Sequence, residues 1–266
     1  MIKKMNDSRP IGVFDSGVGG LSVWKEIVKK LPNESVIYFA DSANCPYGSK
    51  TEQEIIELSK KNVDFLIDKQ CKIIVLACNT ATAAAIDYLR KKYKIPFIGM
   101  EPAVKPASLH SKTKSIGVLA TEGTFNGRLY QETKERFAKD VKVNIKGGNK
   151  LVDIVENNLI YEKETKEHLQ KLIRPFIKMN IDHLVLGCTH YPFLMPVLRE
   201  VLPGNVKILD PAPAVAKQTY NILKQKNLIN QNSGKTIYEF YTNGNKDILN
   251  NFLKNITDKK FYLYQQ

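Results

Sequence analysis

The chain has 266 residues, 43% of them apolar and 25% charged, which is long enough for two domains of roughly 100 to 150 residues. No apolar run approaches the roughly 18 residues of a membrane helix, and the polar segment 1–10 lacks the apolar core of a signal peptide, so we expect a cytoplasmic protein with no membrane partner. The formal charge of +13 is scattered along the chain and only six of the 40 basic residues are Arg, which argues against a nucleic-acid partner.

Short apolar runs alternate with segments of helical periodicity in the first part of the chain. We expect strands at 11–14, 36–40, 73–77 and 96–100. Between them, the spacing of apolar residues predicts helices at 21–31, 51–69 and 80–93. The helix at 51–69 opens with Thr51-Glu52-Gln53-Glu54, which has the form of a capping box.

The same pattern then begins again. We expect strands at 115–119, 141–145, 183–186 and 206–209, and helices at 125–138, 151–159, 163–179 and 192–202. The tail adds a helix at 214–226, a strand at 238–241 and a helix at 246–254. Strand–helix alternation of this kind predicts an α/β protein with mainly parallel sheets flanked by helices on both faces.

A weak internal repeat indicates two related halves. Ile11-Gly12-Val13 recurs 105 residues later as Ile116-Gly117-Val118. The string Val75-Leu76-Ala77-Cys78 recurs 110 residues later as Val185-Leu186-Gly187-Cys188. The repeat therefore places one cysteine at the C-terminal end of the third strand in each half.

This position of Cys78 and Cys188 favours a catalytic role. Ligands of open parallel sheets bind beyond the C-terminal ends of the strands. Both cysteines lie where a helix opens, and a helix N-terminus lowers the pKa of a thiol from about 8.5. If the halves face each other, two thiols on opposite sides of one carbon can remove a proton from one face and return one to the other. That reaction is a racemisation or an epimerisation.

Four polar clusters at predicted strand ends contain neither Lys nor Arg, so the ligand they favour is small and zwitterionic. Helix N-termini with Ser and Thr hydroxyls can hold its carboxylates. Asp15 can bind its ammonium group or polarise a nearby thiol. Without a lysine there is no obvious Schiff-base anchor, which argues against pyridoxal phosphate. The clusters are Asp15-Ser16-Gly17-Val18-Gly19-Gly20, Asn44-Cys45-Pro46-Tyr47-Gly48-Ser49, Cys78-Asn79-Thr80-Ala81-Thr82 and Cys188-Thr189-His190-Tyr191-Pro192.

These residues also admit other interpretations. A dinucleotide fingerprint would need glycine where Ser22 stands, and Asp15 would repel a pyrophosphate. The glycines could equally serve only a tight turn. A metal site of Cys78, Cys188 and His190 would be short of ligands. We favour His190 as a catalytic helper, whereas Cys45 is as compatible with packing as with lining the site.

The sequence resembles the glutamate racemase family, part of the aspartate/glutamate racemase superfamily. The likeness extends from about residue 10 to about residue 255, and the two cysteine strings at this separation are highly specific. The matching strings are the Asp15–Gly20 turn, Pro46-Tyr47-Gly48, Ala77-Cys78-Asn79-Thr80-Ala81-Thr82, Gly187-Cys188-Thr189-His190-Tyr191-Pro192 and Tyr241-Thr242-Asn243-Gly244.

The resemblance implies roles for individual residues. Cys78 would act on D-glutamate with Asp15 as its helper, and Cys188 on L-glutamate with His190 as its helper. Glu156 aligns with a family acid near the second thiol. No cofactor and no metal would be used. The substrate-binding residues would be Asp15, Ser16, Tyr47, Gly48, Asn79, Thr80, Thr189 and His190.

The resemblance also implies two similar α/β domains with the active site in the cleft between them. The first, 1–102 with 211–266, would carry Asp15 and Cys78, and the second, 103–210, would carry Cys188. D-Glutamate would supply peptidoglycan synthesis, and hence cell-wall formation and cell shape. One departure affects the expected place of Glu156, because Gly148-Asn149 stands where the family usually has Cys-Pro.

Two rival functions stay open. The chain could be an aspartate racemase or another amino-acid racemase of the same superfamily. It could also be a non-catalytic binding protein for acidic ligands, although such a protein would not need two cysteines at strand ends. The expected partner is a small-molecule substrate, and a homodimer is left open.

Overall fold

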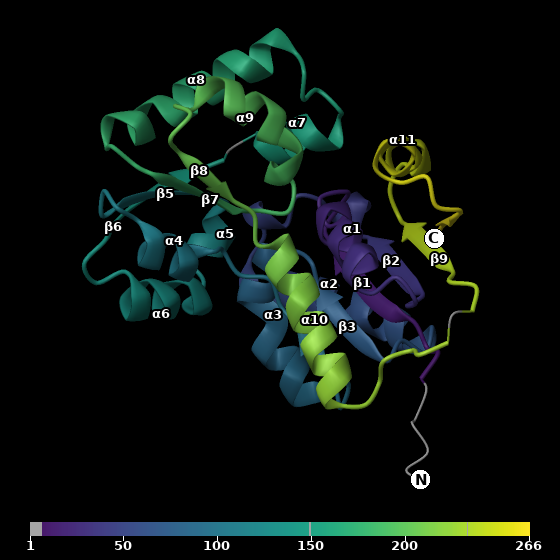
Figure 1. Cartoon of the computed structure of the whole chain (residues 1–266). Helices are drawn as coiled ribbons and strands as arrows, with labels where there is room; N and C mark the ends of the chain where they lie inside the picture. Colours follow the sequence, from purple (N-terminus) through teal and green to yellow (C-terminus); the bar gives the residue numbers. More distant parts are fainter. Residues whose placement is uncertain (1–6, 149, 233) are drawn as a thin grey trace.

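The protein is described by a computed structural model that covers residues 7–148, 150–232 and 234–266. Two parallel sheets form its framework, one of six strands in the order β10-β9-β2-β1-β3-β4 and one of four in the order β6-β5-β7-β8 (Figure 1). The strands are β1 (Ile11–Asp15), β2 (Val36–Ala40), β3 (Ile73–Leu76), β4 (Phe97–Ile98), β5 (Ser115–Ala120), β6 (Lys142–Gly147), β7 (His183–Gly187), β8 (Lys207–Leu209), β9 (Tyr238–Thr242) and β10 (Tyr262–Gln265).

Helices connect the strands and cover the sheets. They are α1 (Leu21–Lys30), α2 (Glu52–Asp68), α3 (Asn79–Lys92), α4 (Val104–His110), α5 (Glu122–Phe125), α6 (Arg128–Phe137), α7 (Leu151–Glu156), α8 (Lys163–Lys178), α9 (Met195–Val201), α10 (Ala212–Gln225) and α11 (Lys246–Ile256). Short 3-10 turns occupy Ser42–Asn44, Tyr47–Ser49 and Tyr191–Leu194. The predicted α/β class with parallel sheets flanked by helices is confirmed.

Strand β1 lies inside the six-stranded sheet and shows why its buried strands have apolar residues on both faces. Ile11 and Val13 pack on one face, in the cluster that holds residues of α1 and α10. Phe14 packs on the other face, in the cluster that holds residues of α2 and α3. Because side chains alternate between the faces of a strand, a sheet covered on both sides needs apolar residues at every position.

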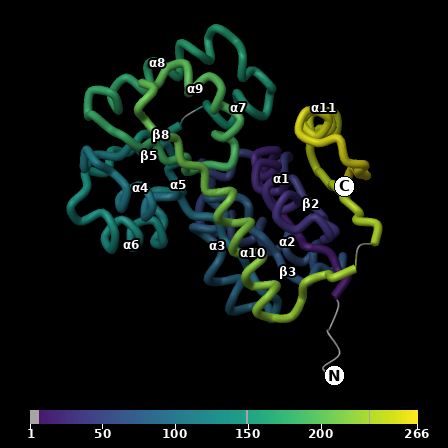
Figure 2. The backbone as a smooth tube through the Cα atoms, in the orientation of Figure 1, coloured from purple at the N-terminus to yellow at the C-terminus, as the bar shows by residue number. Residues whose placement is uncertain are grey.

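The repeat strings occupy equivalent places in the two sheets. Ile11-Gly12-Val13 lies in β1, between β2 and β3, and Ile116-Gly117-Val118 lies in β5, between β6 and β7. Each cysteine string lies at the C-terminal end of the third strand of its half, β3 or β7. The chain leaves the second sheet through α10 and returns to the first, where β9 pairs with β2 (Figure 2).

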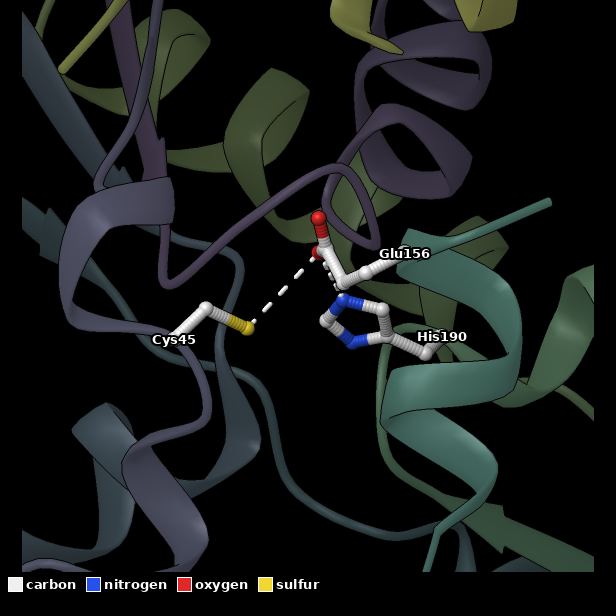
Figure 3. Close-up of side chains that lie close together, drawn as sticks. All are labelled: Cys45, Glu156 and His190. Atoms are coloured by element: carbon white, nitrogen blue, oxygen red, sulfur yellow. Dashed lines mark hydrogen bonds and ion pairs between the residues drawn. The ribbon is translucent and has the colours of Figure 1, made fainter. Parts of the chain in front are cut away.

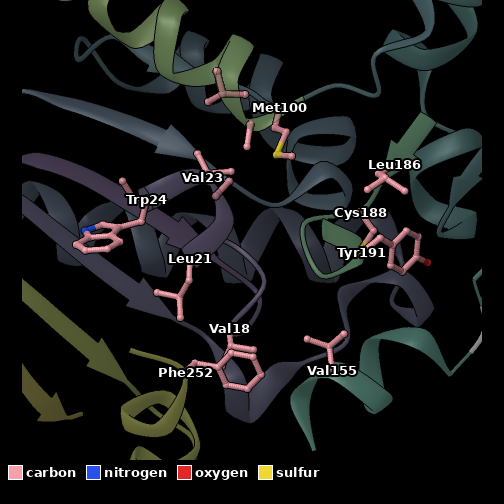
Figure 4. Close-up of a cluster of buried hydrophobic side chains, with 14 of the residues drawn as sticks. Val18, Leu21, Val23, Trp24, Met100, Val155, Leu186, Cys188, Tyr191 and Phe252 are labelled. Carbon is pink, nitrogen blue, oxygen red and sulfur yellow. The ribbon is translucent and has the colours of Figure 1, made fainter. Parts of the chain in front are cut away.

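One buried cluster joins the two units. Val18 and Leu21 from the first unit, and Val155 and Leu186 from the second, belong to the same core, together with Cys188 (Figure 4). The tail adds to this core, because Phe252 of α11 packs edge-on against Phe193, with ring centroids 5.2 Å apart. Both units therefore bury apolar surface next to the strand ends.

Several elements differ from the sequence-based expectations. The predicted helix at 125–138 is two helices, α5 and α6, and the break falls at Asn126-Gly127, where Gly127 caps α6. The helix expected at 192–202 begins as a 3-10 turn before α9. Helix α4 and edge strand β10 were not predicted. The capping box at Thr51 and Glu54 is confirmed.

Across the described part of the chain, no helix has both the length and the apolar character needed to cross a bilayer. The composition-based expectation of no membrane helix agrees with this finding.

A buried ion pair ties distant parts of the first unit together. Lys72 Nζ lies 2.6 Å from Glu34 Oε2, and the side chains are 0% and 1% exposed. Glu34 Oε1 also accepts a hydrogen bond from the backbone N–H of Asn230, at 2.8 Å. The pair therefore joins the start of β3, the segment before β2 and the tail.

We expect Glu34→Ala to lower the free energy of unfolding by about 3–5 kcal/mol, because it leaves the Lys72 ammonium buried without its partner. Urea unfolding followed by circular dichroism measures the change. Glu57→Ala is the matched control, since it removes the exposed partner of Lys60 and should barely move the midpoint. Equal effects of the two variants would contradict this account of Glu34.

Candidate active site

Asp15 ends β1 and is completely buried. Its Oδ2 accepts hydrogen bonds from the backbone N–H groups of Gly20, at 2.9 Å, and Gly17, at 3.2 Å. Its Oδ1 accepts one from the Thr189 hydroxyl, at 3.2 Å. Burial raises the pKa of Asp15, while the nearby His190 and the two N–H groups oppose the shift. Asp15 therefore connects its own glycine turn to the loop that carries the second cysteine.

Cys78 follows β3 and is the N-cap residue of α3, as predicted. Its Sγ accepts a hydrogen bond from the Ala81 N–H, at 3.4 Å, and lies 3.7 Å from Ser16 Oγ. Burial, followed by the negative charge of Asp15, raises the pKa of Cys78 to about 12. The predicted lowering of this pKa is wrong, because one N–H group cannot offset the loss of water and a nearby carboxylate.

Cys188 follows β7 and is also buried. Its Sγ lies 3.7 Å from Nδ1 of His190. Cys188 is among the groups that raise the pKa of Cys78, after burial and Asp15, so the two sulfurs lie close enough to interact electrostatically. Cys78 contacts Ser16, and the preceding residue, Asp15, accepts a hydrogen bond from Thr189, which follows Cys188. These contacts link the two cysteines. The structure thus brings the two predicted cysteines to one site.

His190 and Glu156 form an ion pair (Figure 3), and the His190 ring also lies beside Cys188. Nε2 of His190 lies 2.6 Å from Oε1 of Glu156, which ends α7. Burial alone would lower the pKa of His190, but contacts with Cys188, Cys45 and Glu156 outweigh it and raise the pKa well above its ordinary value. Burial would likewise raise the pKa of Glu156, yet the contact with His190 dominates and lowers it. Both groups are therefore held in their charged forms.

Glu156 contacts His190, and its place is fixed from the first unit as well. Its Oε1 accepts a hydrogen bond from the Val18 N–H, at 2.8 Å. A Cβ atom at Gly17 would stand 1.9 Å from that oxygen, so only glycine allows the turn to approach so closely. Gly148 accepts a hydrogen bond from the Tyr191 hydroxyl, at 3.4 Å. Asn149, the other half of the noted departure, lies outside the described residues.

Tyr47 belongs to a polar network that includes Asp41, Asn62 and Asn243. Its hydroxyl donates to Asp41 and accepts from Asn62 Nδ2, the latter at 3.1 Å. Asn243, from the family-like tail string, donates to the other oxygen of Asp41, at 2.5 Å. Burial, followed by the charge of Asp41, raises the pKa of Tyr47. This phenol is therefore neutral, and its contacts fix the loop that carries Gly48.

Thr80 meets the second unit through two hydroxyls that the sequence did not single out. Its Oγ1 lies 2.9 Å from Thr121 Oγ1 and 3.3 Å from Thr124 Oγ1. The adjacent Asn79 donates from Nδ2 to the carbonyl oxygen of Met100, at 3.3 Å. Its buried Oδ1 has no hydrogen-bond partner among the described residues, which leaves an acceptor free beside Cys78.

Cys45 lies at the site, which the sequence left undecided. It is half-buried, and its Sγ is 3.7 Å from Oε1 of Glu156 (Figure 3). Asp41, Thr121 and Thr124 also contact site residues but carry no motif of their own. In the sequence, these residues could have been identified by their positions after the strands β2 and β5, because ligand sites lie beyond strand ends.

Comparison with known proteins supports one assignment. A family model described as Asp/Glu/Hydantoin racemase matches residues 11–219. The glutamate racemase of Herpetosiphon aurantiacus is 42% identical over 236 residues, which cover 89% of this chain and 93% of that protein. The crystal structure of glutamate racemase isoform RacE1 from Bacillus anthracis matches with a TM-score of 0.88 and 32% identity, over 99% of this chain and 98% of the other. Glutamate racemase from Francisella tularensis in complex with D-glutamate matches with a TM-score of 0.84 and 32% identity, over 98% of each chain.

The fold and these matches define the class of the protein, which is an isomerase. The chain belongs to the Asp/Glu/hydantoin racemase family, and its predicted likeness to the glutamate racemases of that family is confirmed.

The His190–Glu156 pair generates a pH-dependent prediction. Because folding raises the pKa of His190, the stabilisation from the pair is fully present below pH ~6.5 and is lost as pH rises through the folded pKa. On the acid side it is lost as pH falls through the lowered pKa of Glu156. We expect Glu156→Gln to move the titration midpoint of His190 downwards in an NMR titration.

The other three histidines are internal controls, and the substitution should leave their resonances unchanged. An unchanged midpoint for His190 in the variant would show that Glu156 does not determine its charge.

Proposed function

We propose that the protein interconverts L- and D-glutamate with two cysteines and no cofactor. One observation carries the proposal: a cysteine from each unit enters a single network of contacts built around the buried Asp15. The similar proteins are glutamate racemases, and the one from Francisella tularensis was crystallised with D-glutamate. For the units we propose the boundaries 1–102 with 211–266, and 103–210.

The proposed reaction uses one thiolate and one thiol in each turnover. With D-glutamate bound, the Cys78 thiolate takes the α-proton while Cys188 gives its proton to the opposite face of the carbon. With L-glutamate, Cys188 is the base and Cys78 the acid. Each turnover therefore leaves the protons exchanged between the two sulfurs, and the reverse reaction restores them.

Asp15 and His190 would assist their own thiols in different ways. Asp15 lies near Cys78 and disfavours its thiolate, so Cys78 rests as a neutral acid. A substrate ammonium held near Asp15 would add a positive charge there and favour the thiolate. His190, charged through its pair with Glu156, has its Nδ1 3.7 Å from Cys188 Sγ, where it can exchange a proton with that sulfur.

The intermediate carbanion needs stabilisation, because an α-proton beside an ionised carboxylate is very weakly acidic. Preorganised donors in a water-poor site are the available means. The Thr80 and Thr189 hydroxyls and the helix N-terminus at Asn79 can hold the substrate carboxylates, and Oδ1 of Asn79 can accept from the ammonium. Ser16, Tyr47 and Gly48 would complete the substrate site.

D-Glutamate made in this way would supply peptidoglycan synthesis, a cytoplasmic step that supports the cell wall and cell shape. The assignment of glutamate, in preference to aspartate, follows the similar proteins.

Solvent exchange tests the proposal directly. Purified protein is incubated with L-glutamate in D₂O without added cofactor, and both enantiomers are analysed at early times. Two bases predict deuterium mainly in newly formed D-glutamate, since the proton from solvent enters on the product face. Heavy label in recovered L-glutamate would indicate a single base, and turnover of aspartate alone would reassign the substrate.

Substitution of the cysteines tests their roles. We expect Cys78→Ser and Cys188→Ser each to lower the racemisation rate by about 10²–10⁴-fold, because a hydroxyl cannot replace a thiol as acid and base. Cys71→Ala is the matched control, since Cys71 is buried at the opposite end of β3, against Gly12. Circular dichroism, or an assay with the other enantiomer of glutamate, confirms that each variant is folded. Full activity in either serine variant would exclude that cysteine as a base.

A further inference from the structure

We propose that Cys45, Glu156 and His190 form a binding site for a divalent transition metal, with Zn²⁺ as the ion that fits best, and that the bound ion joins the two units in an inactive state. The three ligand atoms, Sγ, a carboxylate oxygen and a ring nitrogen, lie within 4.8 Å of one another. The site differs from the cysteine–histidine set considered from the sequence, because it excludes both Cys78 and Cys188.

The contacts around one oxygen carry this inference. Oε1 of Glu156 faces Sγ of Cys45 at 3.7 Å and Nε2 of His190 at 2.6 Å. The Cys45 thiol donates a hydrogen to this oxygen, and the ring N–H of His190 faces it as well. One divalent cation can replace these two hydrogens, and the same three atoms then become its ligands.

The distances suit zinc after a small local change. Zinc bonds of about 2.0–2.3 Å in a tetrahedron separate its ligand atoms by about 3.3–3.7 Å. The sulfur–oxygen distance already falls in this range, the His190–Glu156 contact must lengthen by about 0.7 Å, and the sulfur–nitrogen distance is at most 4.8 Å. A thiolate, an imidazole and a carboxylate together select zinc over magnesium or calcium, which prefer oxygen ligands. Water can take the fourth position.

Charge and room also favour the ion. A thiolate and a carboxylate carry two negative charges, which a divalent cation neutralises in this partly buried place. Gly17 lies next to two of the ligands, and a Cβ atom there would stand 3.2 Å from Sγ of Cys45 as well as against Glu156. Figure 3 shows the three side chains converging, and the absence of a side chain at Gly17 leaves room for them.

The ligands come from both units. Cys45 follows β2 of the six-stranded sheet, whereas Glu156 ends α7 and His190 follows β7 of the four-stranded sheet. A bound ion would hold the units together and would replace the proton on Nε2 of His190, so that the ring beside Cys188 would no longer be an imidazolium. The loss of racemase activity that follows from this rests on the proposed function, whereas the binding of the ion does not.

Cobalt binding tests the site without any turnover. Co²⁺ replaces Zn²⁺ in such sites and gives a thiolate charge-transfer band when sulfur is a ligand. We titrate the full chain with Co²⁺ and then with Zn²⁺, which should displace the cobalt. We expect one ion per chain, a charge-transfer band, and a rise in Tm on addition of Zn²⁺.

Two variants and one control locate the ion. Cys45→Ser should abolish the band and the rise in Tm, and Glu156→Gln should weaken binding by more than about 100-fold, since it removes a direct ligand. Cys71→Ala should bind as the unsubstituted protein does. A band that persists in Cys45→Ser and disappears in Cys188→Ser would place the ion on the catalytic cysteine and overturn the proposal. The absence of binding below millimolar Co²⁺ would also overturn it.

A separate assay addresses inhibition. Micromolar Zn²⁺ should lower the rate of the unsubstituted protein reversibly, with recovery on addition of EDTA, while Cys45→Ser should be insensitive. If the protein binds one Co²⁺ through Cys45 and yet turns over no glutamate, the metal site stands and the proposed substrate falls. If Cys45→Ser is inhibited as strongly as the unsubstituted protein, inhibition arises elsewhere and this part of the proposal fails.

Discussion

The buried carboxylate of Asp15 is the constraint on which the site depends. A charge without water must be matched by hydrogen bonds and opposite charge. The glycine turn supplies two N–H groups, and the second unit supplies the Thr189 hydroxyl and the nearby positive charge of His190. Because half of this compensation comes from each unit, Asp15 is fully satisfied only when the units lie against each other. The same contact that stabilises the carboxylate thus assembles the site.

The charges of the site alternate in a way that sets the two thiols apart. Asp15 is close to Cys78 and raises its pKa, whereas the positive His190 lies beside Cys188 and is itself held charged by Glu156. The two sulfurs therefore have unequal electrostatic surroundings. The proposed reaction would need such an inequality, since two thiols or two thiolates could not both take and give a proton. In that proposal the charge of the substrate would also contribute, because its ammonium group would lie near Asp15.

The sequence predicted the framework of the protein well, for a physical reason. Buried parallel strands need apolar residues at every position, and this pattern is easily read in segments such as 73–76 and 183–187. Elements with weak local signals were missed, such as the edge strand β10, half-exposed and rich in tyrosine, and the short α4. The break at Gly127 was also missed, because helical spacing continues across it.

In the site, the limit of prediction was the pairing of residues from different units. The strand-end clusters were recognisable because polar residues follow apolar strands. The contacts of Thr80 with Thr121, and of Cys45 with Glu156, join positions 41 and 111 residues apart, and nothing local to either partner encodes them. The pKa of Cys78 shows the same limit, because the helix N-terminus is visible in the sequence whereas the burial and the neighbouring carboxylate are not.

The cross-unit contacts have a reciprocal form that bears on the proposed chemistry. The end of β1 in the first unit, at Asp15, contacts Thr189, which follows the cysteine of the second unit. Thr121, which directly follows β5 in the second unit, contacts Thr80, which lies just after the cysteine of the first unit. Since β1 and β5 hold the matching repeat strings, the two contacts are related by an approximate exchange of the halves. Such an exchange carries Cys78 towards the place of Cys188 and the reverse.

A pair of related half-sites is what two mirror-image substrates require, since each enantiomer presents its α-hydrogen to the opposite half. The side chains that follow the cysteines differ between the halves, with Asn79 and Thr80 in one and Thr189 and His190 in the other. In the proposed reaction, the framework would be shared between the two directions, while the acid–base chemistry of each direction would be set by its own helper residue.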